Sequence, residues 1–242
     1  MQVFVHSRVI ARAVLFLGMV TFAVLVGPGR AHAATPPLPS ADHFVAEVDN
    51  PYFPLEPQTT YQFTGLKGGE SRRSRFTITR RTRKIMGVTC LVIEDNAATA
   101  AGIPIERTWD YFAQDDRGNV WYFGEDSLDY VSGRWVRSDG SWRAGVDGAT
   151  PGIVMEAHPQ PGDTYQQEHY AGHAEDQAKV IGFVETVTVP AGTFHNVLVT
   201  EDSTPLRPGD VDRKFYAPDV GFIQSKAVHS DEHSELVNII EP

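Results

Sequence analysis

Short runs in which β-branched and aromatic residues alternate with polar residues follow one another along most of the chain. Alternation with a period of two is typical of half-buried β-strands, and no segment shows the capped 3.6-residue stripe of an amphipathic helix. Turn signals such as KGGE (67–70), DDRGN (115–119) and PAGTF (190–194) separate the runs. The pattern predicts an all-β fold with little helix, either an antiparallel sandwich or a partial (half) barrel.

The order of these runs repeats once, at an offset of roughly 104 residues. Three segments of the first part recur in the same order in the second part. The pairs are PQTTYQ (57–62) with PGDTYQ (161–166), GVTCLVIED (87–95) with GTFHNVLVTED (192–202), and ERTWDYFAQDDRGNV (106–120) with DRKFYAPDVGFI (212–223). Two similar β-meanders inside one domain would produce this repeat.

The repeat and the composition together suggest a domain plan. Residues 34–56 are rich in proline and predict an extended N-terminal arm, followed by a single β domain at 57–242. Its repeat-like halves cover about 57–120 and 161–223. Between them lies an aromatic and acidic excursion, residues 121–160, which has no counterpart in the second half. Long excursions in compact domains are often functional, so function is sought there.

Residues 1–33 have the features of a secretory signal peptide. Arg8 and Arg12 precede an apolar run at 13–27, and Ala31-His32-Ala33 matches an A-x-A cleavage site. The apolar run is shorter than the roughly 20 residues that a membrane-spanning helix needs. The sequence therefore predicts a secreted or periplasmic protein that meets the membrane only through its cleaved signal.

Composition narrows the classes of partner. The chain has 31 acidic and 21 basic residues and a net charge of −10, which disfavours nucleic acid. Its single cysteine, Cys90, lies in an apolar run and can form no intramolecular disulfide. Phosphate-binding loops, dinucleotide motifs and the G-x-S-x-G elbow are missing from the sequence, so no cofactor is expected. A small molecule is the expected partner.

Four motifs resemble a family of exported bacterial β-rich proteins: NPYFPL (50–55), QDDRGNVWYFGE (114–125), VPAGTF (189–194) and YAPDVG (216–221). The resemblance covers nearly the whole mature chain and implies export and a β-rich fold. The last two motifs also resemble periplasmic carrier proteins, whose curved half-barrel sheets hold apolar cargo. The resemblance supplies no reaction and no catalytic residues.

Aromatic residues in and beside the excursion either fill the core or line a cavity. Curved antiparallel sheets with aromatic inner faces enclose apolar ligands, and nearby carboxylates would give polar specificity at the mouth. The favoured hypothesis is a non-catalytic protein that binds a small apolar or aromatic-compatible ligand. The predicted ligand-binding residues are Trp109, Asp110, Trp121, Tyr122, Glu125, Trp142 and Asp147.

The alternative hypothesis is a secreted hydrolase or lyase that uses Glu125 with Glu168 or His169. Glycoside hydrolysis requires two carboxyl groups about 5 to 9.5 Å apart in one cleft. A structural or interaction module is the second alternative.

Two histidine pairs, each spaced by four residues, are the candidates for metal binding: His169 with His173, and His229 with His233. A zinc or copper site needs three or four converging ligands, and nothing in the spacing brings the two pairs together. The sequence therefore predicts no metal site.

Overall fold

The computed structural model describes residues 37–242, and the predicted signal peptide lies outside the described residues. These residues form one antiparallel sheet of fifteen strands and a short 3-10 helix, η1 (Ala41–His43). Within residues 37–242, no helix has the length and apolar character of a membrane span. The prediction of an all-β partial barrel with little helix is confirmed.

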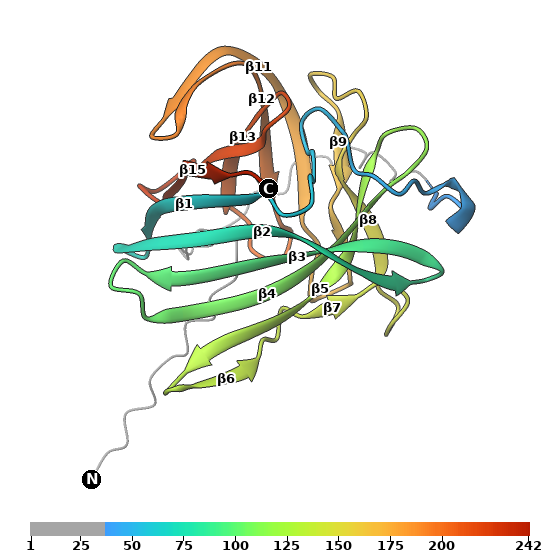
Figure 1. The fold of residues 1–242 in the computed structure, drawn as a ribbon, viewed down its shortest axis with the longest axis horizontal. Helices are drawn as coiled ribbons and strands as arrows, with labels where there is room; N and C mark the ends of the chain where they lie inside the picture. The colour runs from blue at the N-terminus through green and yellow to red at the C-terminus, as the bar shows by residue number, and fades with distance from the viewer. Residues whose placement is uncertain (1–36) are drawn as a thin grey trace.

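The first half of the barrel is a meander in which each strand pairs with the next (Figure 1). Its strands are β1 (Thr60–Lys67), β2 (Glu70–Ile85), β3 (Val88–Thr99), β4 (Pro104–Gln114) and β5 (Val120–Val131). The second half is a meander of the same form. Its strands are β9 (Thr164–Gln166), β11 (Gln177–Val189), β12 (Gly192–Ser203), β13 (Val211–Ala217) and β14 (Gly221–Ala227). The echoed segments fall on strands that occupy the same position in each meander.

The two meanders are joined differently on their two sides. On one side β15 (His233–Ile240) pairs with both β14 and β1. On the other side β8 (Thr150–Met155) pairs with β5, and β10 (Glu168–His169) pairs with β8. Only Gln167 separates β9 from β10 in the chain, so the two edges of the sheet meet at a single seam. The excursion also contributes β6 (Arg134–Arg137) and β7 (Trp142–Arg143), which both pair with β5.

Gly152 allows the two edges to approach closely at the seam. A Cβ atom on this residue would lie 2.4 Å from the carbonyl oxygens of both Gln166 and Gln167. Its neighbour Pro151 has no N–H group with which to extend a ladder. Among the described strands no ladder joins β8 to β9. The barrel is therefore nearly closed, with backbone packed against backbone at one unsealed seam.

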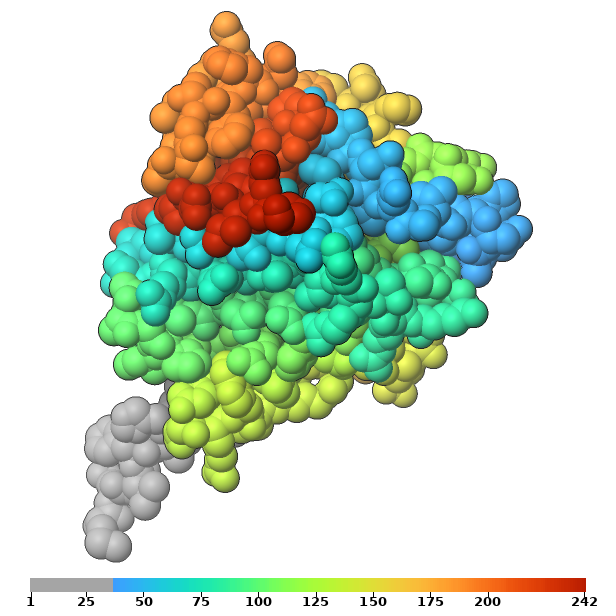
Figure 2. All heavy atoms as spheres, viewed as in Figure 1, coloured from blue at the N-terminus to red at the C-terminus, as the bar shows by residue number. Residues whose placement is uncertain are grey.

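The described part of the N-terminal arm packs against the barrel and lies on the surface beside β1 and β2 (Figure 2). Its anchor is Asn50, which is 2% exposed. The Asn50 side chain donates to the carbonyl oxygens of Gly118 at 2.9 Å and Glu156 at 3.0 Å. Beyond this anchor, Phe53 and Leu55 reach the barrel interior.

Candidate ligand cavity

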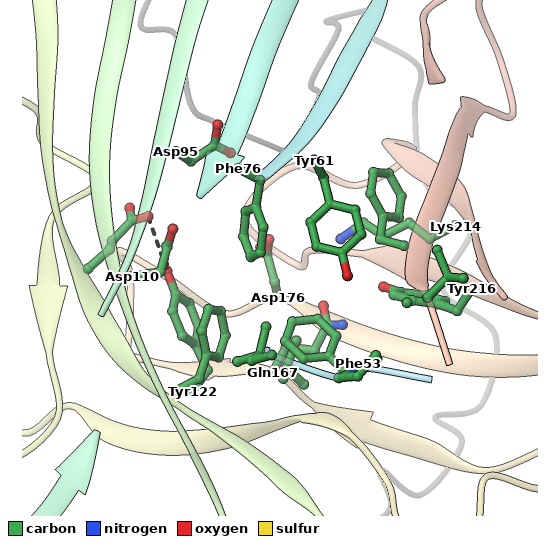
Figure 3. Close-up of a pocket in the computed structure, with 18 of the residues that line it drawn as sticks. Phe53, Tyr61, Phe76, Asp95, Asp110, Tyr122, Gln167, Asp176, Lys214 and Tyr216 are labelled. Atoms are coloured by element: carbon green, nitrogen blue, oxygen red, sulfur yellow. Dashed lines mark hydrogen bonds between the residues drawn. The ribbon is translucent and has the colours of Figure 1, made fainter. Parts of the chain in front are cut away.

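The barrel interior contains a cavity of about 130 Å³ that is partly open to solvent. An engineered cavity of about 150 Å³ in another protein holds benzene, so this space suits a group the size of one ring. Aromatic side chains from both halves and from the arm surround it (Figure 3). They are Phe53, Tyr61, Phe63, Phe76, Phe112, Tyr122, Tyr216 and Phe222.

Strand alternation brings corresponding residues of the two halves to this cavity. On β4, Asp110 and Phe112 face inward, and on β13 Lys214 and Tyr216 do so. Both pairs are spaced by two, as residues on one face of a strand must be. The inner face therefore combines aromatic rings with ionisable groups.

A β-bulge gives the cavity two residues of β5 that simple alternation would separate. Tyr122 and Glu125 are three positions apart, yet both line the cavity. Phe112 pairs with Tyr122 and Asp110 pairs with Glu125, so β5 carries one more residue than β4 between these two pairs. Gly124 lies within the bulge with φ of 115°, a conformation that favours glycine.

The polar part of the cavity is strongly acidic. Its carboxyl groups belong to Asp95, Asp110, Glu125, Glu168 and Asp176. The Tyr122 hydroxyl donates to Asp110 Oδ1 at 2.6 Å and stands 3.1 Å from Glu125 Oε2.

Burial shifts the pKa values of two of these groups. It raises the pKa of Asp110 to about 7, although the hydrogen bond from Tyr122 acts in the opposite direction. Burial also raises the pKa of Asp95 well above its usual range, and the neighbouring Asp110 and Glu106 raise it further. Both carboxyls therefore hold protons at a pH at which exposed aspartates have lost them.

Lys214 is the one lysine or arginine among the described residues that line the cavity. Its ammonium nitrogen lies 2.8 Å from Asp202 Oδ2, and both side chains are buried. Burial alone would lower the pKa of Lys214, but the contact with Asp202, together with the charges of Asp176 and Asp212, outweighs burial and raises the pKa. The lysine charge is thus already matched by a carboxylate.

Three of the seven predicted ligand-binding residues, Asp110, Tyr122 and Glu125, line the cavity together. Trp142 is buried behind them, with its ring edge-on to Tyr122 at 5.4 Å between centroids. It supports the wall of the cavity without lining it.

The other three predicted ligand-binding residues lie elsewhere. Trp109, on the face of β4 opposite Asp110, donates to Glu94 at 3.0 Å. Trp121 lies on the face of β5 opposite Tyr122 and donates to Asp115 at 2.9 Å, with its ring edge-on to Phe44. Asp147 is exposed in the turn between β7 and β8. Alternation along each strand keeps both tryptophans out of the cavity.

The candidate catalytic residues are also divided. Glu125 and Glu168 both line the cavity. His169 follows Glu168 on β10 and is therefore exposed on the other side, with its Nδ1 3.0 Å from Thr150 Oγ1. The structure thus brings Glu125 together with Glu168 but not with His169.

The four metal-ligand candidates have other neighbours. The ring of His173 stacks on Tyr170 at 4.3 Å, and His233 Nδ1 lies 2.8 Å from the Asp231 carbonyl oxygen. His229 is exposed. Among residues 37–242, no three His, Cys, Asp or Glu side chains form a group that could hold a metal ion.

Sequence reasoning did not select Asp95, Asp176, Lys214 or most of the aromatic lining. A signal for Asp95 existed, because it recurs as Asp202 in the echoed segment and shares a strand face with Ile93. An aspartate that repeats in line with core residues is a candidate for the barrel interior.

No protein-family model matches the chain, and no curated protein sequence matches it. Among solved structures, the chain is similar to the crystal structure of a putative lipoprotein from Parabacteroides distasonis. The two share 11% sequence identity with a TM-score of 0.42, over 78% of this chain and 98% of that chain. A similarity at this level carries no argument about function, which must rest on the cavity itself.

Proposed function

We propose that this protein is an exported binding protein that takes one small apolar or aromatic ligand into the barrel cavity. The observation that carries the proposal is the ring-sized space inside the barrel, which eight aromatic side chains line. Export rests on the signal-like residues 1–33 and on the resemblance to exported bacterial proteins.

The energetics of the cavity favour an apolar guest. Transferring apolar surface from water into such a site contributes about 25 cal/mol per Å². The rings of Phe112 and Tyr122 are stacked at 4.7 Å between centroids, so contacts within the protein hold part of the wall in place. A wall ordered in advance reduces the entropy lost on binding.

The test is calorimetric titration of the mature protein with benzyl alcohol, a neutral probe of one ring. We expect saturable binding with one molecule per chain. Val154→Trp would fill the cavity, because Val154 lines it, and should abolish the binding. Val136→Trp, at an exposed position on β6, is the matched control and should bind as the wild type does.

Two results would contradict the proposal: no saturation with the wild type, or equal binding by Val154→Trp. The first result would favour a structural or interaction module.

A hydrolase or lyase remains the second candidate, because Glu125 and Glu168 share the cavity with Asp110. The pKa of about 7 at Asp110 suits a group that gives and takes protons near neutral pH. A ligand that copurifies with the exported protein distinguishes the two candidates when it is incubated with fresh protein. If the ligand is recovered unchanged after prolonged incubation, binding is favoured. If the wild type converts the ligand to a product and the Glu125→Gln variant does not, catalysis is favoured.

A further inference from the structure

The two halves of the barrel provide a comparison within one molecule. In the second half Asp202 on β12 pairs across the strands with Asp212, and Lys214 pairs with Thr200. Asp202 and Lys214 are therefore diagonal neighbours on the inner face, and they form the 2.8 Å ion pair. This half places an ammonium beside its buried aspartate.

The first half has the same register with a different side chain. Asp95 on β3 pairs with Thr108, and Asp110 on β4 pairs with Ile93. Asp95 and Asp110 are thus diagonal neighbours in the relation that Asp202 and Lys214 have. The correspondence extends along the strand, because Phe112-Ala113 follows Asp110 as Tyr216-Ala217 follows Lys214. Where the second half has a lysine, the first half has a second carboxyl group.

One carboxyl oxygen of Asp95 also lacks a partner. The residue is 1% exposed and lines the cavity, and its Oδ1 has no hydrogen-bond partner among residues 37–242. A buried polar atom without a partner destabilises the folded state, and a buried carboxylate without a nearby cation destabilises it more. The other buried lysine, Lys67, has Glu232, Glu106 and Asp212 as its acidic neighbours.

We propose that the ligand carries an ammonium or similar cationic group, which binds between Asp95 and Asp110 in place of the lysine that this half lacks. The inference rests on the proposed function and specifies the ligand's charge. In Figure 3, Asp95 and Asp110 stand on one side of the cavity and Lys214 on the other, with the rings of Phe76 and Tyr61 between them. Those rings would hold the apolar body of the ligand and attract its charge.

The experiment compares benzylamine, benzyl alcohol and benzoate by calorimetry at pH 8, which lies above the pKa of about 7 at Asp110. The three probes share one ring and differ in charge. We expect benzylamine to bind at least about 10-fold more tightly than benzyl alcohol, because its ammonium group can form charge-assisted hydrogen bonds to the carboxylates, which are stronger than those of a neutral hydroxyl. Benzoate should bind most weakly.

Asp95→Asn and Asp110→Asn locate the charge within the cavity. In each variant, the affinity for benzylamine should fall about 10-fold or more, while the affinity for benzyl alcohol stays the same. Glu94→Gln is the matched control, since Glu94 is on the same strand but bonds to Trp109 on the outer face. This control should keep the preference.

Asp110→Lys gives the first half the ammonium that the second half has. This variant should unfold at a higher temperature than the wild type at pH 8 and should no longer bind benzylamine. Asp95→Asn, which hardly changes shape, keeps the proposal testable if Asp110→Lys does not fold.

The outcomes separate the inference from the proposed function. Equal or tighter binding of benzyl alcohol would overturn the cationic ligand and leave cavity binding intact. Saturation by none of the three probes would overturn both. A preference for benzylamine that survives both asparagine variants would overturn the assignment to Asp95 and Asp110.

Discussion

Gly124 decides which side chains of β5 reach the cavity. Its φ of 115° permits the bulge that brings both Tyr122 and Glu125 to the inner face. A Cβ atom there would lie 2.4 Å from the Trp142 carbonyl oxygen on β7. Gly124 thus permits both the inward placement of Tyr122 and Glu125 and the close approach of β7, which belongs to the excursion.

Replacing Gly124 should therefore destabilise the fold. We expect Gly124→Ala to lower the free energy of unfolding by roughly 2 to 5 kcal/mol, because backbone strain and the clash add together. Gly133→Ala, in the turn after β5, is the control: its φ is 83° but its Cβ would meet nothing within 4 Å. This control should lose only about 1 to 2 kcal/mol. Urea denaturation measures the free energy of unfolding of both variants. Equal losses in the two variants would show that the contact with Trp142 is unimportant.

At the scale of elements, the N-terminal arm is part of the barrel wall. It supplies Phe53, Pro54 and Leu55 to the cavity. Asn50 fixes the arm by bonding to carbonyl groups at 118 and 156, which precede β5 and follow β8 at the same end of this strand pair. Entry of a ligand past the arm would therefore require this anchor to move.

The anchor makes a second prediction. Asn50→Ala should destabilise the fold by roughly 2 to 4 kcal/mol, since it leaves two carbonyl oxygens and the Tyr52 N–H without their partner. Asn238→Ala removes an exposed bond to Gln62 and should change stability by no more than about 0.5 kcal/mol. Denaturant titration of both variants tests the claim, and a loss within about 0.5 kcal/mol for Asn50→Ala would show that the arm is held by other contacts.

For the whole molecule, mild acid should increase stability, whereas it lowers the stability of most proteins. The buried acidic side chains are the reason. The folded-state pKa is about 7 for Asp110 and about 6 for Asp212, and burial is the main cause of both shifts. Unfolded aspartates titrate near pH 3.9, so between about pH 4 and 7 the folded state binds more protons than the unfolded state. Stability from these groups is present at low pH and is lost as pH rises through this window.

We therefore expect the ligand-free protein to be more stable at pH 5 than at pH 7.5. A tenfold difference between the acid dissociation constants of the folded and unfolded states corresponds to about 1.4 kcal/mol per group. Asp126 acts in the opposite direction, because Tyr111 and the nearby arginines lower its pKa, but its effect lies below pH 4. Guanidinium titrations at the two pH values test the prediction, and Asp110→Asn should reduce the difference. Greater stability at pH 7.5 would contradict it.

The sequence by itself determined the strands and their order. Alternation is local, so each strand could be predicted from its own residues, and the echo indicated two meanders because similar strands pair in similar ways. Alternation also places Trp109 and Asp110 on opposite faces of β4. The aromatic and acidic residues in and beside the excursion marked Asp110, Tyr122 and Glu125 as candidate ligand-binding residues.

Only the tertiary structure decided which faces point inward, how the barrel closes and which groups meet. The bulge at Gly124 shifts the register by one residue, and a shift of one residue moves side chains to the opposite face. The seam at Gly152 depends on contact between β8, in the excursion, and residues 166–167 at the start of the second half. Asp95 and Asp110 become neighbours through the pairing of β3 with β4. These are non-local contacts, and the physical reason the sequence did not show them is that register and closure are set by packing between distant segments.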